Sequence, residues 1–216
     1  MKKTSLFLTV LCILAVSASA QPQLEKGKLL FGVSSTMKVG GSDGSEFLGL
    51  GFSTTSYKTG SDPAEAAYKY TTYNLLPQAG YFIMNNLAAG LEVIISGYTE
   101  KDVEDGDKWS EKTLAVGPFV RYYYPLEKIY PFAEAEVLFG SYKGSWYDET
   151  TGVMVLGLSV GAAIPIGEMV TFDILAGYSR AAYNYKEQVE MDPYKEICAG
   201  FGIKMGFIVY MGLPGQ

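Results

Sequence analysis

Large apolar residues alternate with small or polar residues along several segments of the chain. In residues 87–96 the odd positions hold Leu, Ala, Leu, Val and Ile, while the even positions include Glu92 and Ser96. Residues 156–164 repeat the pattern, with Gly157, Ser159 and Gly161 between larger apolar residues. A period of two is typical of a strand with two different faces. Segments of about ten such residues between polar links predict a transmembrane β-barrel.

The pattern predicts an all-β fold, an eight-stranded antiparallel up-and-down transmembrane β-barrel. Small inward residues fit this size, because eight strands enclose only packed side chains. Short turns are expected at 85–86, 125–130 and 165–168, and longer polar links at 58–69, 100–111, 143–151 and 184–195. Bacterial barrels place short turns in the periplasm and long loops outside. The predicted spanning strands are 46–57, 70–84, 87–99, 112–124, 130–142, 152–164, 169–183 and 196–211.

Residues 28–37 also alternate like a strand and would make nine. A ninth span would conflict with the even strand number and periplasmic termini of single-chain barrels. We therefore expect 21–45 to be a non-spanning N-terminal lead-in and 46–216 to be the barrel. An alternative is that 28–37 form the lower half of an interrupted first strand, broken at the glycine-rich residues 40–44.

Residues 1–20 have the features of a secretory signal peptide. Lys2 and Lys3 precede the apolar run 6–16, and Ala18-Ser19-Ala20 is a small-residue cleavage pattern. The run is too short for a membrane helix, which needs about 20 apolar residues. The sequence therefore predicts export through the Sec pathway and a place in the bacterial cell outer membrane.

Composition narrows the classes further. Removal of Lys2 and Lys3 changes the formal charge from -6 to -8, which argues against a nucleic-acid partner. After cleavage Cys198 is the one remaining cysteine, so no intramolecular disulfide is expected. The chain is 48% hydrophobic, and no mature segment has the pattern of a membrane helix. An exported apolar chain of this kind satisfies its backbone groups in lipid as a closed barrel.

Three segments, 77–82, 85–91 and 117–124, resemble the outer membrane protein β-barrel domain family of small porin-like barrels. The resemblance extends over roughly 27–211 and implies eight strands. It implies little about function, because members range from membrane anchors to proposed small channels. Gly212 to Gln216 follow the last aromatic residue where a barrel usually ends on Phe, so Phe207 and Tyr210 are expected to replace that signal for the insertion machinery.

Charged residues occur in the inward phase of the predicted strands. Arg121 falls opposite Glu134 in a hairpin centred between residues 127 and 128, so the two are expected to pair. Asp173 and Lys204, on adjacent strands, form a possible second pair. Buried charges need such partners. Two interpretations stay open, a plug of paired charges and a polar path or gate. The lumen charge network consists of Glu92, Arg121, Glu134, Glu136, Asp173 and Lys204.

Aromatic residues cluster beside the predicted turns and at the C-terminal end. Amphipathic rings favour the headgroup level of a bilayer. We therefore predict an aromatic girdle that contains Tyr81, Tyr122, Tyr124, Phe207 and Tyr210.

The chain has no histidine. This excludes Ser/His/Asp and Cys/His catalysis and zinc sites of the common type. A carboxylate pair, Glu134 with Glu136, leaves hydrolysis formally open. The acidic link 101–109 lacks EF-hand spacing and is expected to be a solvated loop. We expect no enzyme activity, no cofactor and no metal.

The sequence therefore predicts a non-enzymatic cell-envelope protein that acts as a membrane anchor or in surface interaction. The alternative is a narrow passive channel for small solutes or hydrophobic molecules. The expected partners are outer-membrane lipid, lipopolysaccharide and the barrel-insertion machinery, and the expected state is a monomer.

A barrel has a simple biochemical signature. We expect the folded mature protein to migrate differently on a gel before and after boiling in detergent. Circular dichroism in detergent should show mainly β-structure, and a spectrum without it would contradict the predicted fold.

Overall fold

The computed structural model describes residues 22–38, 50–57, 65–124, 126–145, 149–185 and 193–212. The predicted signal peptide lies outside these residues. Within them, no helix is long and apolar enough to cross a bilayer. The elements in chain order are η1 Pro22–Leu24, β1 Leu29–Lys38, β2 Leu50–Tyr57, β3 Glu65–Met84, β4 Leu87–Asp102, β5 Lys108–Tyr123, β6 Tyr130–Gly144, β7 Thr151–Pro165, β8 Val170–Tyr185 and β9 Tyr194–Met211.

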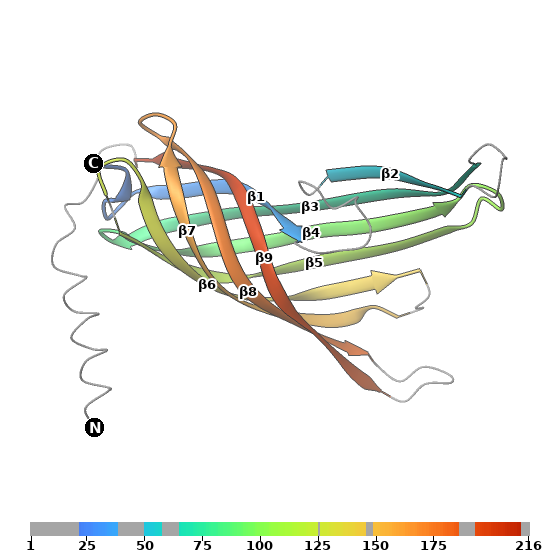
Figure 1. The fold of residues 1–216 in the computed structure, drawn as a ribbon. Helices are drawn as coiled ribbons and strands as arrows, with labels where there is room; N and C mark the ends of the chain where they lie inside the picture. Colours follow the sequence, from blue (N-terminus) through green and yellow to red (C-terminus); the bar gives the residue numbers. More distant parts are fainter. Residues whose placement is uncertain are drawn as a thin grey trace, which may run out of the picture.

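The described strands form one antiparallel sheet that closes on itself (Figure 1). Consecutive strands from β2 to β9 are neighbours, and β1 closes the wall by pairing with β9 on one side and β3 on the other. β1 pairs with β3 over residues 76–81, whereas β2 pairs with β3 over residues 65–73. β1 and β2 therefore occupy one position of the wall, and the fold is the predicted eight-stranded barrel.

The expectation that residues 21–45 lie outside the barrel is wrong for β1. Leu29–Lys38 are part of the wall, and the alternative of an interrupted first strand is confirmed. The prediction failed because it counted apolar segments. β1 and β2 run in the same direction, and both are antiparallel to β3. Together they make one strand of the barrel, so the number of spanning strands stays even.

The two faces of the wall follow the alternation in the sequence. Leu91, Leu158 and Val160 point outward and are 56%, 67% and 65% exposed, whereas Ala88 and Glu92 are fully buried on the lumen side. Only an apolar outer face is compatible with surrounding lipid, so the strand pattern predicted from sequence is the one that the barrel uses.

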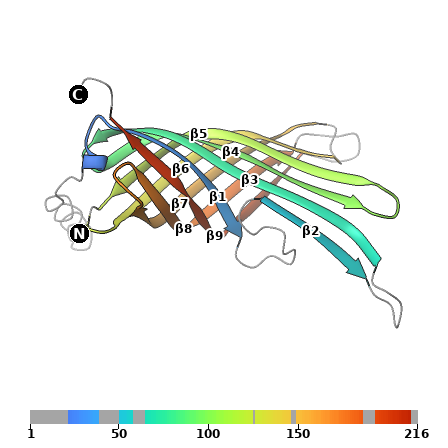
Figure 2. The ribbon, with the colours of Figure 1, turned by 90° about the horizontal axis from the view of Figure 1, so that it is seen from above.

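The barrel has two different ends. One, the turn end, carries the short connections 85–86, 124–129 and 166–169. Asn86 has a positive φ of 68°, which asparagine tolerates in a tight turn. At the other, the loop end, β2 to β5 project furthest (Figures 1 and 2). β3 has 20 residues, roughly 65 Å at about 3.3 Å each, while about 9–11 residues cross a bilayer. The surplus lies beyond the hydrocarbon core.

Residues 22–28 form a lid across the turn end. The lid connects the β3–β4 turn with the β7–β8 turn on the opposite side of the barrel. Asn86 N donates to Leu24 O (2.8 Å), and Gln23 Nε2 donates to Gly167 O (3.2 Å). Leu24 is fully buried against the lumen core. This core extends inward from the lid and consists of Leu24, Leu30, Phe82, Ala88, Phe119, Tyr123, Tyr130, Phe132, Ala163, Leu175, Ile208 and Tyr210.

The place of β1 in the wall can be tested by crosslinking. Phe31 lies directly opposite Ala79, so Phe31→Cys with Ala79→Cys in a Cys198→Ser background should crosslink on oxidation. The closed loop would change migration of the boiled protein on a non-reducing gel. Phe31→Cys with Leu75→Cys, four residues out of register, is the control. Equal crosslinking of both pairs would contradict the register.

Candidate functional site

The structure brings all six predicted lumen charges together at mid-height in the barrel. They come from five strands. Glu92 lies on β4, Arg121 on β5, and Glu134 and Glu136 on β6, while β8 and β9 supply Asp173 and Lys204. Arg121 and Glu92 are fully buried, and the other members are nearly so. We call this group the ion network.

Arg121 is the first centre of the ion network. Its Nε donates to Glu134 Oε2 at 2.6 Å, which confirms the pairing predicted from the hairpin register. Its Nη1 reaches across the lumen to Asp173 Oδ2 at 2.7 Å and also donates to Tyr123 Oη at 3.1 Å. Nη2 donates to Gln78 Oε1 at 3.3 Å. One guanidinium thus joins four strands, β3, β5, β6 and β8. It can do so because its planar group carries several N–H donors that point in different directions.

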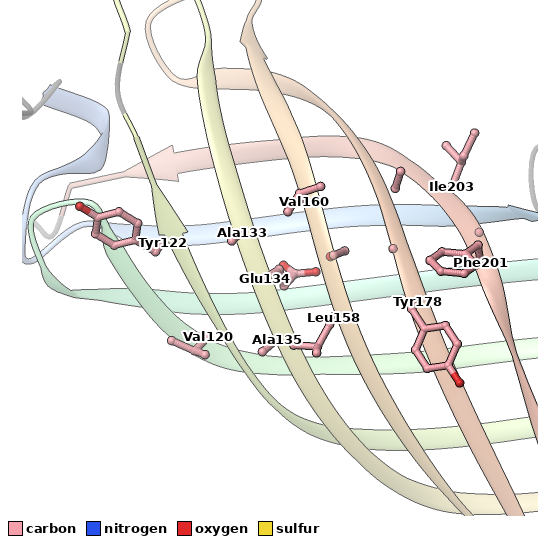
Figure 3. A pocket seen from close by; sticks show the side chains of 14 residues that line it. Val120, Tyr122, Ala133, Glu134, Ala135, Leu158, Val160, Tyr178, Phe201 and Ile203 are labelled. Atoms are coloured by element: carbon pink, nitrogen blue, oxygen red, sulfur yellow. The ribbon is translucent and has the colours of Figure 1, made fainter. Parts of the chain in front are cut away.

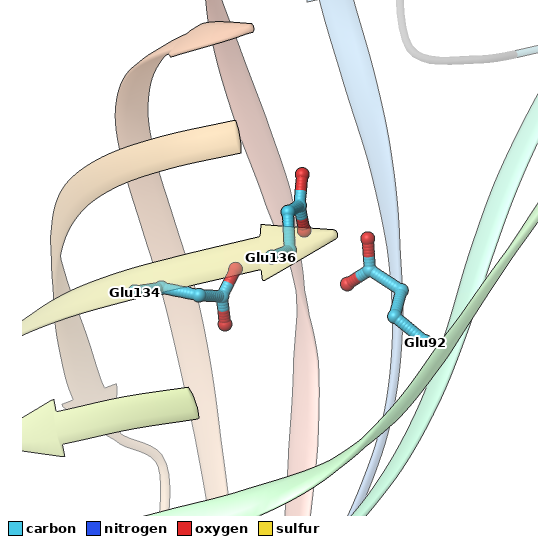
Figure 4. A group of neighbouring side chains, drawn as sticks. All are labelled: Glu92, Glu134 and Glu136. Atoms are coloured by element: carbon cyan, nitrogen blue, oxygen red, sulfur yellow. The ribbon is translucent and has the colours of Figure 1, made fainter. Parts of the chain in front are cut away.

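Lys204 is the second centre. Its Nζ lies 2.9 Å from Glu92 Oε1, 3.3 Å from Glu134 Oε1 and 3.0 Å from Glu136 Oε2. Figure 4 shows the carboxylates of Glu92 and Glu136 pointing toward one another across the lumen, with Glu134 beside them. Glu134 bonds both Arg121 and Lys204, so it links the two centres.

The expected pair of Asp173 with Lys204 is wrong. Asp173 lies opposite Gly206, and Lys204 lies opposite Leu175. Asp173 bonds Arg121 instead, and Lys204 extends to the carboxylates of β4 and β6. The prediction considered neighbouring strands only, whereas the lumen is narrow enough for long side chains to meet strands on the opposite wall.

Among the residues that the structure describes, the three glutamates around Lys204 form an acidic group with the geometry to hold a cation. Their ligand oxygens lie within 4.8 Å of one another. The Lys204 ammonium donates to all three carboxylates, so it supplies the positive charge that a metal ion would supply there. The whole ion network contains four carboxylates and two cations. Because each cation bonds carboxylates from more than one strand, the ion network crosslinks the strands.

Sequence reasoning missed polar residues that complete the ion network. Thr171 Oγ1 donates to Asp173 Oδ1 at 2.7 Å, and the hydroxyls of Tyr123 and Tyr210 are 3.2 Å apart. The placement of Tyr210 in the aromatic girdle is wrong, because its side chain is 2% exposed and lies in the lumen. Its phase could have shown this, since Tyr210 and Lys204 are six positions apart on one strand and therefore share a face.

The other predicted girdle residues are accessible on the outside. Tyr81 and Phe207 are 36% and 51% exposed, and Tyr122 and Tyr124 are half-buried. Phe207 packs against Phe172 on β8, with ring centroids 5.2 Å apart. Contact of these rings with lipid headgroups stays a prediction.

One hollow of the described residues lies on the outer wall and not in the lumen. It measures about 820 Å³ and spans β5 to β9. Tyr178 and Phe201 form its rim, with ring centroids 5.3 Å apart (Figure 3). Its floor is formed by small residues such as Ala133 and Ala135. Because the hollow is apolar and faces outward, lipid covers it in a bilayer.

The acidic link between β4 and β5 is a tight turn. Asp102 Oδ1 accepts hydrogen bonds from the backbone N–H groups of Glu104 (2.8 Å) and Asp105 (3.2 Å). Gly106 takes a positive φ of 77°. Residues 146–148, which include Trp146, lie outside the described residues.

Comparison with known proteins shows the fold class. No protein-family model and no curated protein sequence matches the chain. The crystal structure of the outer membrane protein OprG from Pseudomonas aeruginosa is similar at a TM-score of 0.50 and 14% identity, covering 89% of this chain and 100% of that chain. The outer-membrane expressed OmpT of Vibrio cholerae overlaps at a TM-score of 0.32 and 12% identity, covering 76% and 48%, too loosely to bear on the fold.

The closed antiparallel wall and the likeness to OprG show a small eight-stranded β-barrel, the fold of an outer-membrane protein, and its outer face is apolar. This is the fold that the resemblance of the three sequence segments implies. At 14% identity the likeness shows the fold alone.

The ion network should dominate the stability of the barrel. Arg121→Met leaves Asp173 without a cation and Glu134 with Lys204 alone, so we expect the free energy of unfolding to fall by about 3–5 kcal/mol. Arg121→Met combined with Glu134→Gln should cost less than the sum of the single changes, because the residues interact directly. Urea unfolding in detergent, followed by tryptophan fluorescence, measures both.

Arg180→Met is the matched control, since Arg180 lies in the outward phase of β8. A change within about 0.5 kcal/mol is expected there. Additive losses at Arg121 and Glu134 would contradict the direct coupling.

Proposed function

We propose that the protein is a non-enzymatic anchor in the outer membrane of a bacterium, with a lumen closed to solutes. The observation that carries this proposal is the succession of three closures toward the turn end, namely the ion network, the lumen core and the lid.

Each closure blocks the lumen in a different way. The ion network connects opposite walls, since Arg121 on β5 bonds Asp173 on β8 and Lys204 on β9 bonds Glu92 on β4. Below it, rings pack against one another, with the Tyr123 and Phe132 centroids 5.3 Å apart. A solute would have to displace paired buried charges and then an apolar layer. Open aqueous pores belong to larger barrels.

The proposed anchor carries an extended sheet at its loop end. β3, β4 and β5 continue beyond the membrane-crossing length at the loop end and carry polar residues such as Lys69, Glu100 and Lys112. If the short turns face the periplasm, as in bacterial barrels, this sheet stands outside the cell. Its role is surface interaction or envelope integrity. Outer-membrane lipid and lipopolysaccharide surround the wall, and the barrel-insertion machinery places it there.

Single-channel recording tests the proposal. Refolded wild-type protein in a planar bilayer should give no discrete conductance, because the closures leave no continuous aqueous path. Arg121→Ala and Glu134→Ala should also stay silent while unfolding more easily, since the lumen core and lid remain. A known porin inserted in the same bilayer controls for detection, and heat-dependent gel migration controls for folding. Conductance steps altered by either substitution would favour the channel.

A further inference from the structure

We propose that the loop-end half of the lumen is a blind-ended binding site for one neutral hexose ring, either a free monosaccharide or the terminal residue of a glycan. The site is a hollow of about 240 Å³, here called the outer chamber, bounded by residues of β1, β3, β4, β5, β6 and β8. Its volume equals that of roughly eight waters at about 30 Å³ each, and it is smaller than the ~300–1,000 Å³ of drug-sized sites.

A row of hydrogen-bonding side chains crosses the outer chamber. The register sets Asn74 opposite Ser96, and Ser96 opposite Thr113, so an amide and two hydroxyls lie side by side on the lumen face of three strands. Thr36 adds a hydroxyl from β1, the strand that neighbours β3 on its other side. These four side chains carry no formal charge, and the two charged residues that line the chamber, Glu111 and Lys112, have opposite signs. Such a set of donors and acceptors suits the hydroxyls of a neutral sugar.

Two atoms in this chamber lack a partner. Within the described part of the chain, Thr72 Oγ1 and Asn74 Oδ1 are buried without a hydrogen bond. Both residues line the chamber and share the lumen phase of β3. Buried polar atoms in folded proteins are normally satisfied by protein, water or ligand, since an unpaired buried polar atom is destabilising. Both atoms are inaccessible to water in this side-chain conformation, so a polar occupant of the chamber would pair with them after rotation of the Thr72 and Asn74 side chains.

Aromatic rings supply the complementary surface. Tyr98 and Tyr142 line the chamber, and Tyr142 meets Tyr183 edge to face at 5.4 Å. The C–H faces of a pyranose pack on such rings while its hydroxyls reach the polar row. Apolar faces combined with a few convergent polar groups are the usual composition of small-ligand sites.

A series of rings leads from the loop end to the chamber. Centroid distances are 6.3 Å from Tyr68 to Tyr70, 6.0 Å from Tyr70 to Tyr98 and 5.4 Å from Tyr98 to Trp109. A second hollow of about 330 Å³ lies along this series and is lined by Tyr68 and Trp109. The rings thus form a continuous aromatic surface toward the chamber.

The charges along this route favour a neutral ligand. The second hollow is also lined by Glu100, Asp102 and Asp107 against a single cation, Lys108, so it repels phosphorylated or acidic sugars. At the inner end, Thr36 lies directly opposite Lys204 and also lines a smaller hollow of about 70 Å³ together with Glu136 and Lys204, so the ion network lies next to the inner end of the chamber. The ligand enters and leaves at the loop end and does not cross the barrel.

Saturation-transfer NMR on refolded protein tests the site, with methyl β-D-glucopyranoside and methyl β-D-galactopyranoside as probes. The detergent must have a phosphocholine headgroup, because sugar detergents would compete. At least one hexoside should receive saturation from the protein, and glucose 6-phosphate and alanine should receive little. A trisaccharide saturated only in its terminal residue would identify the end of a glycan as the ligand, and saturation of the free hexoside alone would identify a monosaccharide.

Variants locate the binding. Asn74→Leu and the nearly isosteric Thr72→Val should weaken hexoside binding at least tenfold, while Thr71→Val, on the outward face of the same strand, should leave it unchanged. Heat-dependent gel migration verifies that each variant folds. The proposal is overturned if no hexoside binds, if the phosphorylated sugar or alanine binds better, or if Thr72→Val binds like wild type, because the chamber would then hold only water or another ligand.

Discussion

The constraint on which this barrel depends is the pairing of six charged groups inside a closed wall. Removing a charge from water is expensive, and the expense is offset only by close partners. Arg121 and Lys204 provide them for four carboxylates, and Glu134 connects the two centres. The bonds from Arg121 to Asp173 and from Lys204 to Glu92 and Glu136 join strands three positions apart around the wall, whereas backbone hydrogen bonds reach adjacent strands only. The ion network therefore connects opposite sides of the barrel.

The ion network also divides the lumen into two regions of different chemistry. Toward the turn end, rings and aliphatic side chains pack beneath the lid, with Leu24 and Leu30 fully buried. Toward the loop end, hydroxyl, amide and tyrosine side chains surround the outer chamber. In the two roles that we propose, the barrel is closed to passage and open to a ligand from one side, because the proposed closure and the proposed entrance lie on opposite sides of the paired charges.

The first wall position shows where counting strands in a sequence is misleading. β1 and β2 are separate segments of 10 and 8 residues that share one long neighbour, β3. The rule that a barrel has an even number of strands applies to the strand positions of the wall and not to the number of apolar segments in the sequence. The alternation in residues 28–37 was correct evidence for a strand, and only the register with β3 and β9 showed that this strand closes the barrel.

The sequence by itself determined the strands, their two faces and the hairpin partner of Arg121, because period two and short turns are local properties that survive in any fold. It also placed all six charges on the lumen side. Only the tertiary structure decided which charges meet: Asp173 found Arg121 and Lys204 found three glutamates, against the pairing of neighbours. The lumen position of Tyr210 and the outer chamber likewise emerged with the structure. The physical reason is that contacts across a lumen depend on closure, on the stagger of the strands and on side-chain reach, none of which is encoded within a single hairpin.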